Sequence, residues 1–355
     1  MRSLFGLHDR CCFKVVAYSY GRNDNSGYRK QIERDCDKFV ELDSMNHLEA
    51  AHAINNDEVD ILVELKGYTE GNRLEICAHR PAPVQVAWLG FPGTTGADFL
   101  DYIITDRIVT PREHAQYFSE KFVYMPHTYQ VNDCHQKIAE NKFQRRDFGL
   151  PEDGFVFCSF NEPYKIESVM FDVWMNVLSR VPQSVLWLFK KEHATEENLK
   201  YEAGLRGIDA HRIIFADKLP KDKHLARLQL ADLFLDTRIV NGHTTTSDAL
   251  WASVPVLTLQ GNHFASRVSA SLLRAVGLPE MITTCLPEYE AHAVQLAADP
   301  GLLKTIKEKL SRNRLTKPLF DTVCFARNLE HAYNMMWQIY LQGEEPRQIE
   351  VLSDG

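Results

Sequence analysis

The residues best suited to chemistry lie between positions 236 and 248, after an apolar run at 231–235 that predicts a buried strand and before a predicted helix. Gly242 gives the intervening loop backbone freedom, and the hydroxyl run 244–247 can cap the helix while its first N–H groups face outward. A helix N-terminus of this kind attracts phosphate, and His243 beside it can supply a proton or a hydrogen bond to a developing charge. The same pattern also fits an ordinary strand–helix loop with a good cap.

Two further segments place cations where a phosphate-bearing ligand would need them. Lys165 follows a predicted strand at 155–160, and a lysine in this position can neutralise a leaving diphosphate; a solvated surface lysine is the alternative. Lys221, His224 and Arg227 are spaced i, i+3, i+6 along a predicted helix, roughly on one face. The imidazole could stack on a base with the cations near ribose and diphosphate, or the three could form a solvated basic face.

Two loops in the first half of the chain follow predicted strands, at the edge where open α/β sheets bind ligands. The loop 66–73 contains Tyr68 and by itself fits a plain connection. The loop 90–96 has glycines that let the backbone approach a ligand, but it is too irregular for a dinucleotide-binding fingerprint and has no P-loop lysine. His127, beside a proline, is interpreted as structural, with a catalytic role as the alternative.

The elements that position these residues alternate between strand and helix, which predicts parallel sheets covered by helices. A polar segment at 134–150 predicts a linker between two such regions. A final helix at 322–341 has one apolar stripe of Phe325, Leu329, Tyr333, Met336 and Tyr340. Strands are predicted at 13–18, 39–42, 59–65, 84–89, 101–106, 155–160, 185–189, 213–215, 231–235, 254–259 and 282–284.

Composition excludes several classes of function. The 355 residues are 45% hydrophobic and 25% charged, which is normal for one large or two medium globular domains. The net charge is −8 with no basic patch, so nucleic acid is a poor candidate partner, and there is no apolar run long enough to cross a membrane. The 8 cysteines form no CxxC pair or metal-binding spacing, which favours a reducing, intracellular compartment.

Several motifs occur in one order along the chain and together resemble a known family. The sequence Asn-Gly-His-Thr-Thr at 241–245, followed by Asp248, is similar to the nucleotide-sugar motif of the O-linked N-acetylglucosamine transferases (O-GlcNAc transferases). The Arg-Pro-Ala-Pro strand and Leu-Gly-Phe-Pro-Gly-Thr loop within 80–94, the Phe-Asn-x-x-Tyr-Lys-Ile at 160–166 and the Pro-Lys-x-x-His-x-x-Arg at 220–227 also match. The resemblance covers nearly the whole chain.

This resemblance implies an α/β fold with two Rossmann-like lobes in the glycosyltransferase B arrangement and a C-terminal helix that crosses back to the first lobe. It implies an acceptor-side lobe at 1–140, a UDP-sugar-binding lobe at 141–320, a cross-back helix at 321–345 and a frayed tail at 346–355. The implied reaction moves N-acetylglucosamine from UDP-N-acetylglucosamine to a serine or threonine hydroxyl of a protein, without a metal or other cofactor. We expect no nucleic acid or membrane partner.

The resemblance also assigns roles to residues of this sequence. It implies catalytic roles for Lys165 and His243. It implies donor binding by Tyr164, Lys221, His224 (packed on the uracil), Arg227, Gly242, His243, Thr244, Thr245 and Asp248, and a sugar and acceptor pocket at Tyr68, Leu89, Gly90 and Pro92.

Some positions depart from the family pattern. Glu162 stands where relatives often have glutamine or asparagine, and a carboxylate facing a diphosphate would repel it; Glu70 stands where some have lysine. The tetratricopeptide repeats and the first strand with its histidine loop do not occur in this sequence, so we expect UDP binding with little transfer and a first lobe less stable than the second. A GDP-fucose-dependent protein fucosyltransferase and a catalytically silent UDP-binding protein are the alternatives.

Overall fold

The computed structural model describes residues 1–140 and 142–352, and the chain divides into two compact units. One unit comprises Met1–His135 with Pro318–Gly355, and the other comprises Gln136–Lys317. The sequence predicts the boundary near 140, but the segment after His135 already bonds to the second unit. The indole of Trp251 donates to the carbonyl of Gln136 at 3.0 Å, and the amide of Ala139 donates to the carbonyl of Asp222 at 3.0 Å.

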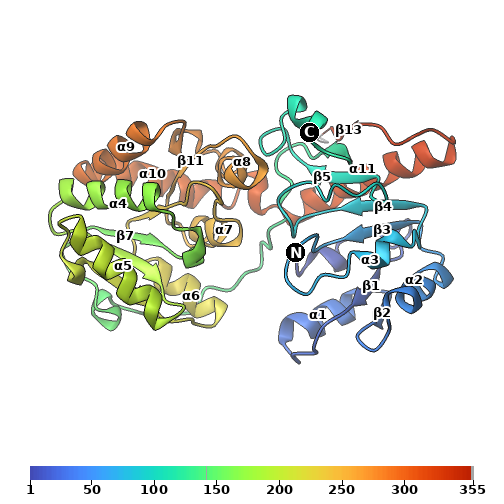
Figure 1. Cartoon of the computed structure of the whole chain (residues 1–355), viewed down its shortest axis with the longest axis horizontal. Helices are drawn as coiled ribbons and strands as arrows, with labels where there is room; N and C mark the ends of the chain where they lie inside the picture. Colours follow the sequence, from blue (N-terminus) through green and yellow to red (C-terminus); the bar gives the residue numbers. More distant parts are fainter. Residues whose placement is uncertain (141, 353–355) are drawn as a thin grey trace. The chain divides into compact units, whose positions relative to one another are not determined.

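The first unit contains a five-stranded parallel sheet in the order β13-β6-β5-β4-β3 (Figure 1). The strands β4 and β5 at its centre are buried along their whole length, as a parallel sheet covered on both faces requires. The strands are β3 Ile61–Glu64, β4 Val84–Ala87, β5 Tyr102–Thr105, β6 Lys121–Tyr124 and β13 Ile349–Glu350; the α-helices of this unit are α1 Gly27–Asp35, α2 His47–Asn56, α3 Glu75–Ala78 and α11 Thr322–Leu341.

The C-terminal segment predicted as a frayed tail at 346–355 is instead partly ordered. Ile349 is 2% exposed, and β13 pairs in parallel with β6, with Ile349 opposite Val123. Both Arg107 and Arg112 form ion pairs with Glu350. The apolar side chain and the charge cluster hold the strand on the sheet edge, and the tail residues 353–355 lie outside the described part. The strand β6 was also missed by the sequence pattern.

The remaining two strands of the first unit form a separate parallel pair, β1 Val16–Ser19 with β2 Lys38–Glu41 (Figure 1). Among the described residues, β1 pairs only with β2 and β3 pairs only with β4. All four residues of β1 and the first three of β3 are only half-buried, unlike the fully buried β4. Among the described residues of the first unit, β1, β2, β3 and β13 therefore each pair on one side only.

The helix α11 packs on the first unit although it follows the second in the chain, as predicted for a helix that crosses back. The side chain of Asp321 caps its N-terminus, and the ring of Phe325 stacks on Trp88 with centroids 5.8 Å apart. The predicted apolar stripe holds at Leu329 and Met336 but ends before Tyr340, which is 47% exposed.

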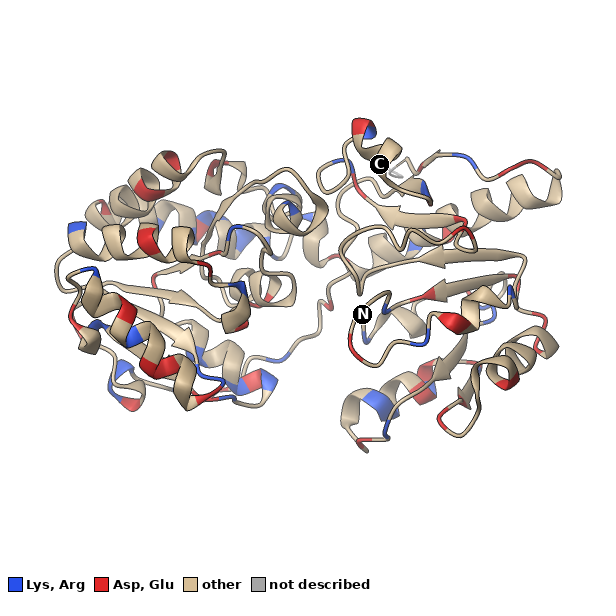
Figure 2. Cartoon of the chain, viewed as in Figure 1, with Lys and Arg blue, Asp and Glu red and all other residues tan. Residues whose placement is uncertain are grey.

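The second unit contains a six-stranded parallel sheet in the order β12-β11-β10-β7-β8-β9. Acidic and basic side chains are interspersed on its helices and loops (Figure 2). The strands are β7 Val156–Ser159, β8 Val185–Phe189, β9 Ile213–Ala216, β10 Leu233–Leu235, β11 Val256–Leu259 and β12 Ile282–Thr283. The helices are α4 Ser168–Arg180, α5 His193–Leu205, α6 Lys221–Leu228, α7 Thr244–Trp251, α8 Val268–Ala275, α9 Leu286–Ala298 and α10 Pro300–Asn313. None of the described helices combines the length and apolarity that a membrane crossing requires.

The half-burial of β1 and β3 leads to a prediction about local stability. Amide hydrogens of β1, β2 and β3 should exchange faster than those of β4 and β5, because strands with few buried apolar contacts open at lower free energy. Hydrogen exchange followed by mass spectrometry of peptides checks this, with the fully buried β7 as the internal reference. Equal protection across β1–β5 would contradict the expectation.

Candidate functional site

The predicted chemical residues of the second unit gather where its strand order reverses. The first strand of the sheet, β7, lies beside β10, and the chain runs outward from this pair in both directions. Open parallel sheets bind ligands in the crevice at the carboxyl ends of such strands. The loop after β7 carries Lys165, and the loop after β10 carries residues 236–243. The fold therefore brings the two motifs together although they are more than seventy residues apart.

A buried carboxylate organises this junction. Asp236 is fully buried, and its Oδ1 accepts hydrogen bonds from the backbone N–H groups of Thr237 (2.9 Å) and Gly242 (2.7 Å) and from the Asn161 side-chain amide (3.1 Å). Its Oδ2 accepts from the Thr258 hydroxyl at 2.7 Å. Burial raises the pKa of Asp236, while the hydrogen bonds oppose that shift. Because every one of these partners is a donor, the network suits an ionised carboxylate.

The loop after β10 is packed too tightly for any side chain at Gly242. A Cβ atom there would lie 2.3 Å from the Thr246 hydroxyl oxygen and 2.7 Å from that of Thr245. The Thr245 hydroxyl itself donates to the side-chain oxygen of Asn161, and the Ser269 hydroxyl donates to the Gly242 carbonyl at 3.0 Å. Glycine is therefore needed for close packing against the start of α7.

The N-terminus of α7 has no side-chain cap, contrary to the expectation that its hydroxyl run would supply one. The Thr245 and Thr246 hydroxyls bond instead to Asn161 and Ser269. Across the described part of the chain, the backbone N–H groups of Thr244 and Thr245 meet no acceptor. These open donors at the positive end of a helix form the kind of site that binds an anion.

Lys165 and His243 lie beside these donors. The Lys165 ammonium donates to the carbonyl of Asn241 at 2.9 Å, and burial lowers the pKa of this lysine. Burial, with the Lys165 charge as a second cause, lowers the pKa of His243 to about 3. The His243 Nε2 has no hydrogen-bond partner among the described residues. His243 is therefore neutral at pH 7, so of the two predicted roles it retains hydrogen bonding and loses proton donation as an imidazolium.

The helix α6 carries the ring of His224 at the site and buries the guanidinium of Arg227. His224 is half-buried and contacts Phe160 edge to face, with ring centroids 5.0 Å apart. Arg227 is only 2% exposed; its Nε donates to His224 Nδ1 at 3.1 Å and its Nη1 donates to the carbonyl of Asp217 at 2.5 Å. Arg227 thus differs from its predicted role of direct ligand contact, because it lies within the fold and fixes the orientation of the His224 ring. Burial is the main cause that lowers the pKa of His224 to about 3.

Two other predicted donor-binding residues form a pair between α6 and α7. The Lys221 ammonium bonds to the carboxylate of Asp248, which is 4% exposed. Burial raises the pKa of Asp248, and the Lys221 charge opposes the shift. Tyr164, also predicted to bind the donor, is 74% exposed beside Lys165. The second unit therefore brings all the predicted donor-binding residues to the carboxyl edge of its sheet, with Arg227 in an indirect role.

Three residues at this edge were not assigned roles from the sequence. Asp236 and Asn161 build the junction, and Lys191 forms an ion pair with Glu162 at 2.8 Å. A signal for Lys191 exists in the sequence, since it is the second residue after the apolar strand β8. The position of Asp236, directly after the apolar strand β10, is a similar but weaker indication of a role at this edge.

The residues predicted for the sugar and acceptor pocket lie together in the first unit. The Tyr68 hydroxyl donates to the carbonyl of Thr95 at 2.6 Å, and its 55% exposed ring contacts Phe91 edge to face. Leu89 has a φ of 74°, and a Cβ at Gly90 would lie 2.1 Å from the carbonyl oxygen of Leu65. This close approach explains the glycine, and half-buried Pro92 continues the same loop.

His127 lies near Asp321 in the first unit. Burial lowers the pKa of His127 and the Asp321 charge opposes the shift, which is compatible with the structural interpretation.

A hollow of about 550 Å³ also opens in this unit, after the carboxyl ends of β1 and β3. Its two cations bond to backbone carbonyls: Lys66 donates to Gly71, and Arg73 donates to Leu42 and Met45.

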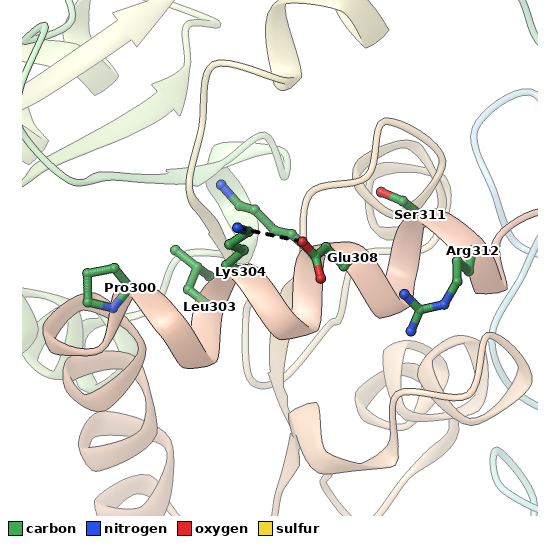
Figure 3. Close-up of a pocket in the computed structure, with 7 residues that line it drawn as sticks. Pro300, Leu303, Lys304, Glu308, Ser311 and Arg312 are labelled. Atoms are coloured by element: carbon green, nitrogen blue, oxygen red, sulfur yellow. Dashed lines mark ion pairs between the residues drawn. The ribbon is translucent and has the colours of Figure 1, made fainter.

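A second hollow, of about 520 Å³, lies on α10 in the second unit (Figure 3). Its labelled side chains come from one helix, and Lys304 and Glu308 form an ion pair at 3.9 Å across it. None of its lining residues belongs to the junction between β7 and β10, so it does not contribute to the site described above.

Comparison with known proteins gives a family. The sequence model of glycosyl transferase family 41 matches residues 1–144 and 139–329. A probable UDP-N-acetylglucosamine–peptide N-acetylglucosaminyltransferase (SEC) of Arabidopsis thaliana is 43% identical over 360 residues, covering 100% of this chain and 37% of that protein. The UDP-N-acetylglucosamine–peptide N-acetylglucosaminyltransferase of Caenorhabditis elegans is 30% identical over 455 residues, covering 97% and 40%. The chain spans less than half the length of these relatives.

Solved structures show the same fold. A mutant O-GlcNAc transferase of Thermobaculum terrenum superposes with a TM-score of 0.88 at 30% identity, covering 96% of this chain and 65% of the other. The HepE protein of Anabaena, in complex with UDP and glucose, has a TM-score of 0.59 at 13% identity, covering 90% and 91%. The second likeness shows the fold alone. Together they confirm the predicted α/β, glycosyltransferase B fold class.

The buried network around Asp236 predicts a large effect of a nearly isosteric change. Asp236→Asn should destabilise the second unit by about 2–3 kcal/mol, because an amide cannot accept from four donors and brings its own N–H groups against them. Urea unfolding measures the change. Thr258→Val, which removes one donor only, is the matched control and should cost about 1–2 kcal/mol. An Asp236→Asn variant as stable as the wild type would show that the carboxyl group is protonated and the network differently ordered.

The two neutral histidines predict acid sensitivity. Both have folded-state pKa values lowered to about 3, below the ordinary 6.5, so the unfolded chain binds protons more readily and stability is lost as the pH falls below 6.5. Between pH 7 and pH 5 we expect a loss of about 2 kcal/mol for each histidine. Urea unfolding across this range checks it.

The variant His224→Gln should remove the contribution of one histidine to this loss of stability. The variant His193→Gln, at a side chain that is 76% exposed, is the control and should leave the loss unchanged. A pH profile unchanged by His224→Gln would contradict the assignment of a neutral, half-buried imidazole to position 224.

Proposed function

Because the chain belongs to glycosyl transferase family 41, we propose that it transfers N-acetylglucosamine from UDP-N-acetylglucosamine to serine or threonine hydroxyls of proteins. The observation that carries the proposal is the junction between β7 and β10, where the open N–H groups of α7, the Lys165 ammonium and His243 meet. The relatives from Arabidopsis and Caenorhabditis are named for this activity, which supports the proposal.

The nucleotide would lie along α6 and the start of α7. The His224 ring, which accepts a hydrogen bond from Arg227, offers a flat surface for the uracil. The pair of Lys221 and Asp248 offers an ammonium and a carboxylate to ribose hydroxyls. The N–H groups of Thr244 and Thr245 would receive the diphosphate, because the N-terminus of a helix favours anions.

Catalysis would depend on stabilising the departing UDP. The acceptor hydroxyl oxygen bonds to the anomeric carbon of the sugar while the bond from that carbon to the diphosphate oxygen breaks. The electron pair of the broken bond passes to the diphosphate, and the hydroxyl proton is released to the diphosphate or to water. The negative charge that develops on the diphosphate meets Lys165 and the positive end of α7, which were in place before the reaction. Neutral His243 would donate a hydrogen bond to this charge. We propose that these groups act without a metal ion or other cofactor.

The acceptor side is assigned to the first unit as part of the same proposal. Tyr68, Leu89, Gly90 and Pro92 form one loop surface at the carboxyl edge of its sheet. We propose that this surface contacts the sugar and the acceptor polypeptide. The exposed thiols of Cys11 and Cys12 are compatible with an intracellular location.

The donor assignment is tested by binding and transfer measured together. Calorimetry with UDP, GDP and ADP should show UDP bound most tightly. Label passed from radiolabelled UDP-N-acetylglucosamine to a serine-containing protein acceptor then measures how much transfer accompanies this binding, for which the sequence predicts a low value. His224→Ala should weaken UDP binding by roughly 1–3 kcal/mol, the range for a base stacked on a ring. Lys223→Ala, at the exposed neighbour on the same helix, is the matched control.

Equal or absent binding of the three nucleotides would refute the donor assignment. Tighter binding of GDP, with fucose transferred from GDP-fucose, would identify the chain as a fucosyltransferase instead. Preserved UDP affinity in a folded His224→Ala variant would remove the ring from the site.

A further inference from the structure

Glu162 places a negative charge at the proposed diphosphate site. It follows Asn161, whose side chain bonds to Asp236 and Thr245 at the start of α7, so the loop position of Glu162 is fixed from the inside. Its charge is close enough to Lys165 to raise the pKa of that lysine, against the larger lowering by burial. A carboxylate at this distance from a diphosphate would weaken its binding unless another charge offsets it.

The offsetting charge comes from the neighbouring strand. Lys191 follows β8, which pairs with all four residues of β7, and the Lys191 Nζ lies 2.8 Å from the Glu162 Oε2. The side chains of Lys191 and Glu162 are 50% and 43% exposed, so the pair lies at the open edge of the sheet rather than within the fold. Partial exposure leaves the ammonium able to face both the carboxylate and an arriving anion.

We propose that Lys191 is a further donor-binding residue, which acts with Glu162 as one neutral pair at the diphosphate site. This inference rests on the proposed donor site of the second unit. The ammonium cancels the repulsion between Glu162 and the diphosphate, so donor affinity follows the summed charge of the two side chains. The sequence can therefore carry a glutamate at a position where a carboxylate alone would disfavour the ligand.

The neighbouring lysine provides a matched control. Lys190 also follows β8, but its ammonium lies 3.5 Å from Glu196 and 3.9 Å from Asp217, away from Glu162. Removal of the Lys190 charge changes the net charge of the protein by the same amount as removal of the Lys191 charge. A difference between the two variants therefore reports the position of the charge.

The test measures UDP and uridine affinities by calorimetry at low salt for wild type, Lys191→Met, Glu162→Gln, the double variant and Lys190→Met. The summed charge of the pair is zero in the wild type and the double variant, −1 in Lys191→Met and +1 in Glu162→Gln. We expect UDP affinity to fall roughly two- to fivefold in Lys191→Met, to rise in Glu162→Gln and to return to the wild-type value in the double variant. Uridine affinity should stay constant, because uridine carries no phosphate, and added salt should compress the differences.

Each other outcome overturns the inference. A Lys191→Met variant that binds UDP like the wild type or like Lys190→Met shows that Lys191 is not at the diphosphate. A double variant that remains as weak as Lys191→Met shows a loss of structure rather than of charge balance. Loss of uridine binding along with UDP binding shows the same. A wild-type chain that binds no UDP refutes the proposed donor site and the inference together, whereas UDP affinity that is insensitive to these charges refutes the inference alone.

Discussion

The junction of the second unit depends on one buried carboxylate. Asp236 ends β10 inside the fold, where an ionised group is costly unless hydrogen bonds compensate for the lost water. Its four donors come from the strand end, from the loop before α7, from the loop after β7 and from β11. Because the carboxylate can be accommodated only if all these segments hold their positions, it connects the segments that build the proposed donor site.

The groups that remain open at this site are those that the network leaves without partners. The hydroxyls near the start of α7 bond to the scaffold, so they do not cap the helix and its first N–H groups stay available. Arg227 is similarly used inside the fold, where it fixes the His224 ring instead of facing a ligand. The groups of the proposed donor site are thus held by buried polar residues that do not themselves reach the surface.

The first unit is organised more loosely. Its central strands are buried on both faces, whereas β1 and β3 are half-buried and pair on one side only in the described structure. The loop proposed to face the sugar is nevertheless closely packed, since Gly90 lies directly against the backbone of the loop after β3. The loop and the strand edges are set by different contacts: close packing at Gly90, and pairing on one side only at β1 and β3 in the described structure.

The sequence by itself determined the strand–helix alternation, the α/β class and the family, because apolar periodicity and ordered motifs are local properties of the chain. It also indicated the Gly242 loop and the cations at the ends of strands. Only the tertiary structure decided how these residues are used. The burial of Arg227, the neutral state of His243, the pairing of Glu162 with Lys191 and the strand at Ile349 all depend on contacts between segments far apart in the chain. Side-chain charge and hydrogen bonding follow from solvent access and distant neighbours, and neither of these is encoded in local spacing.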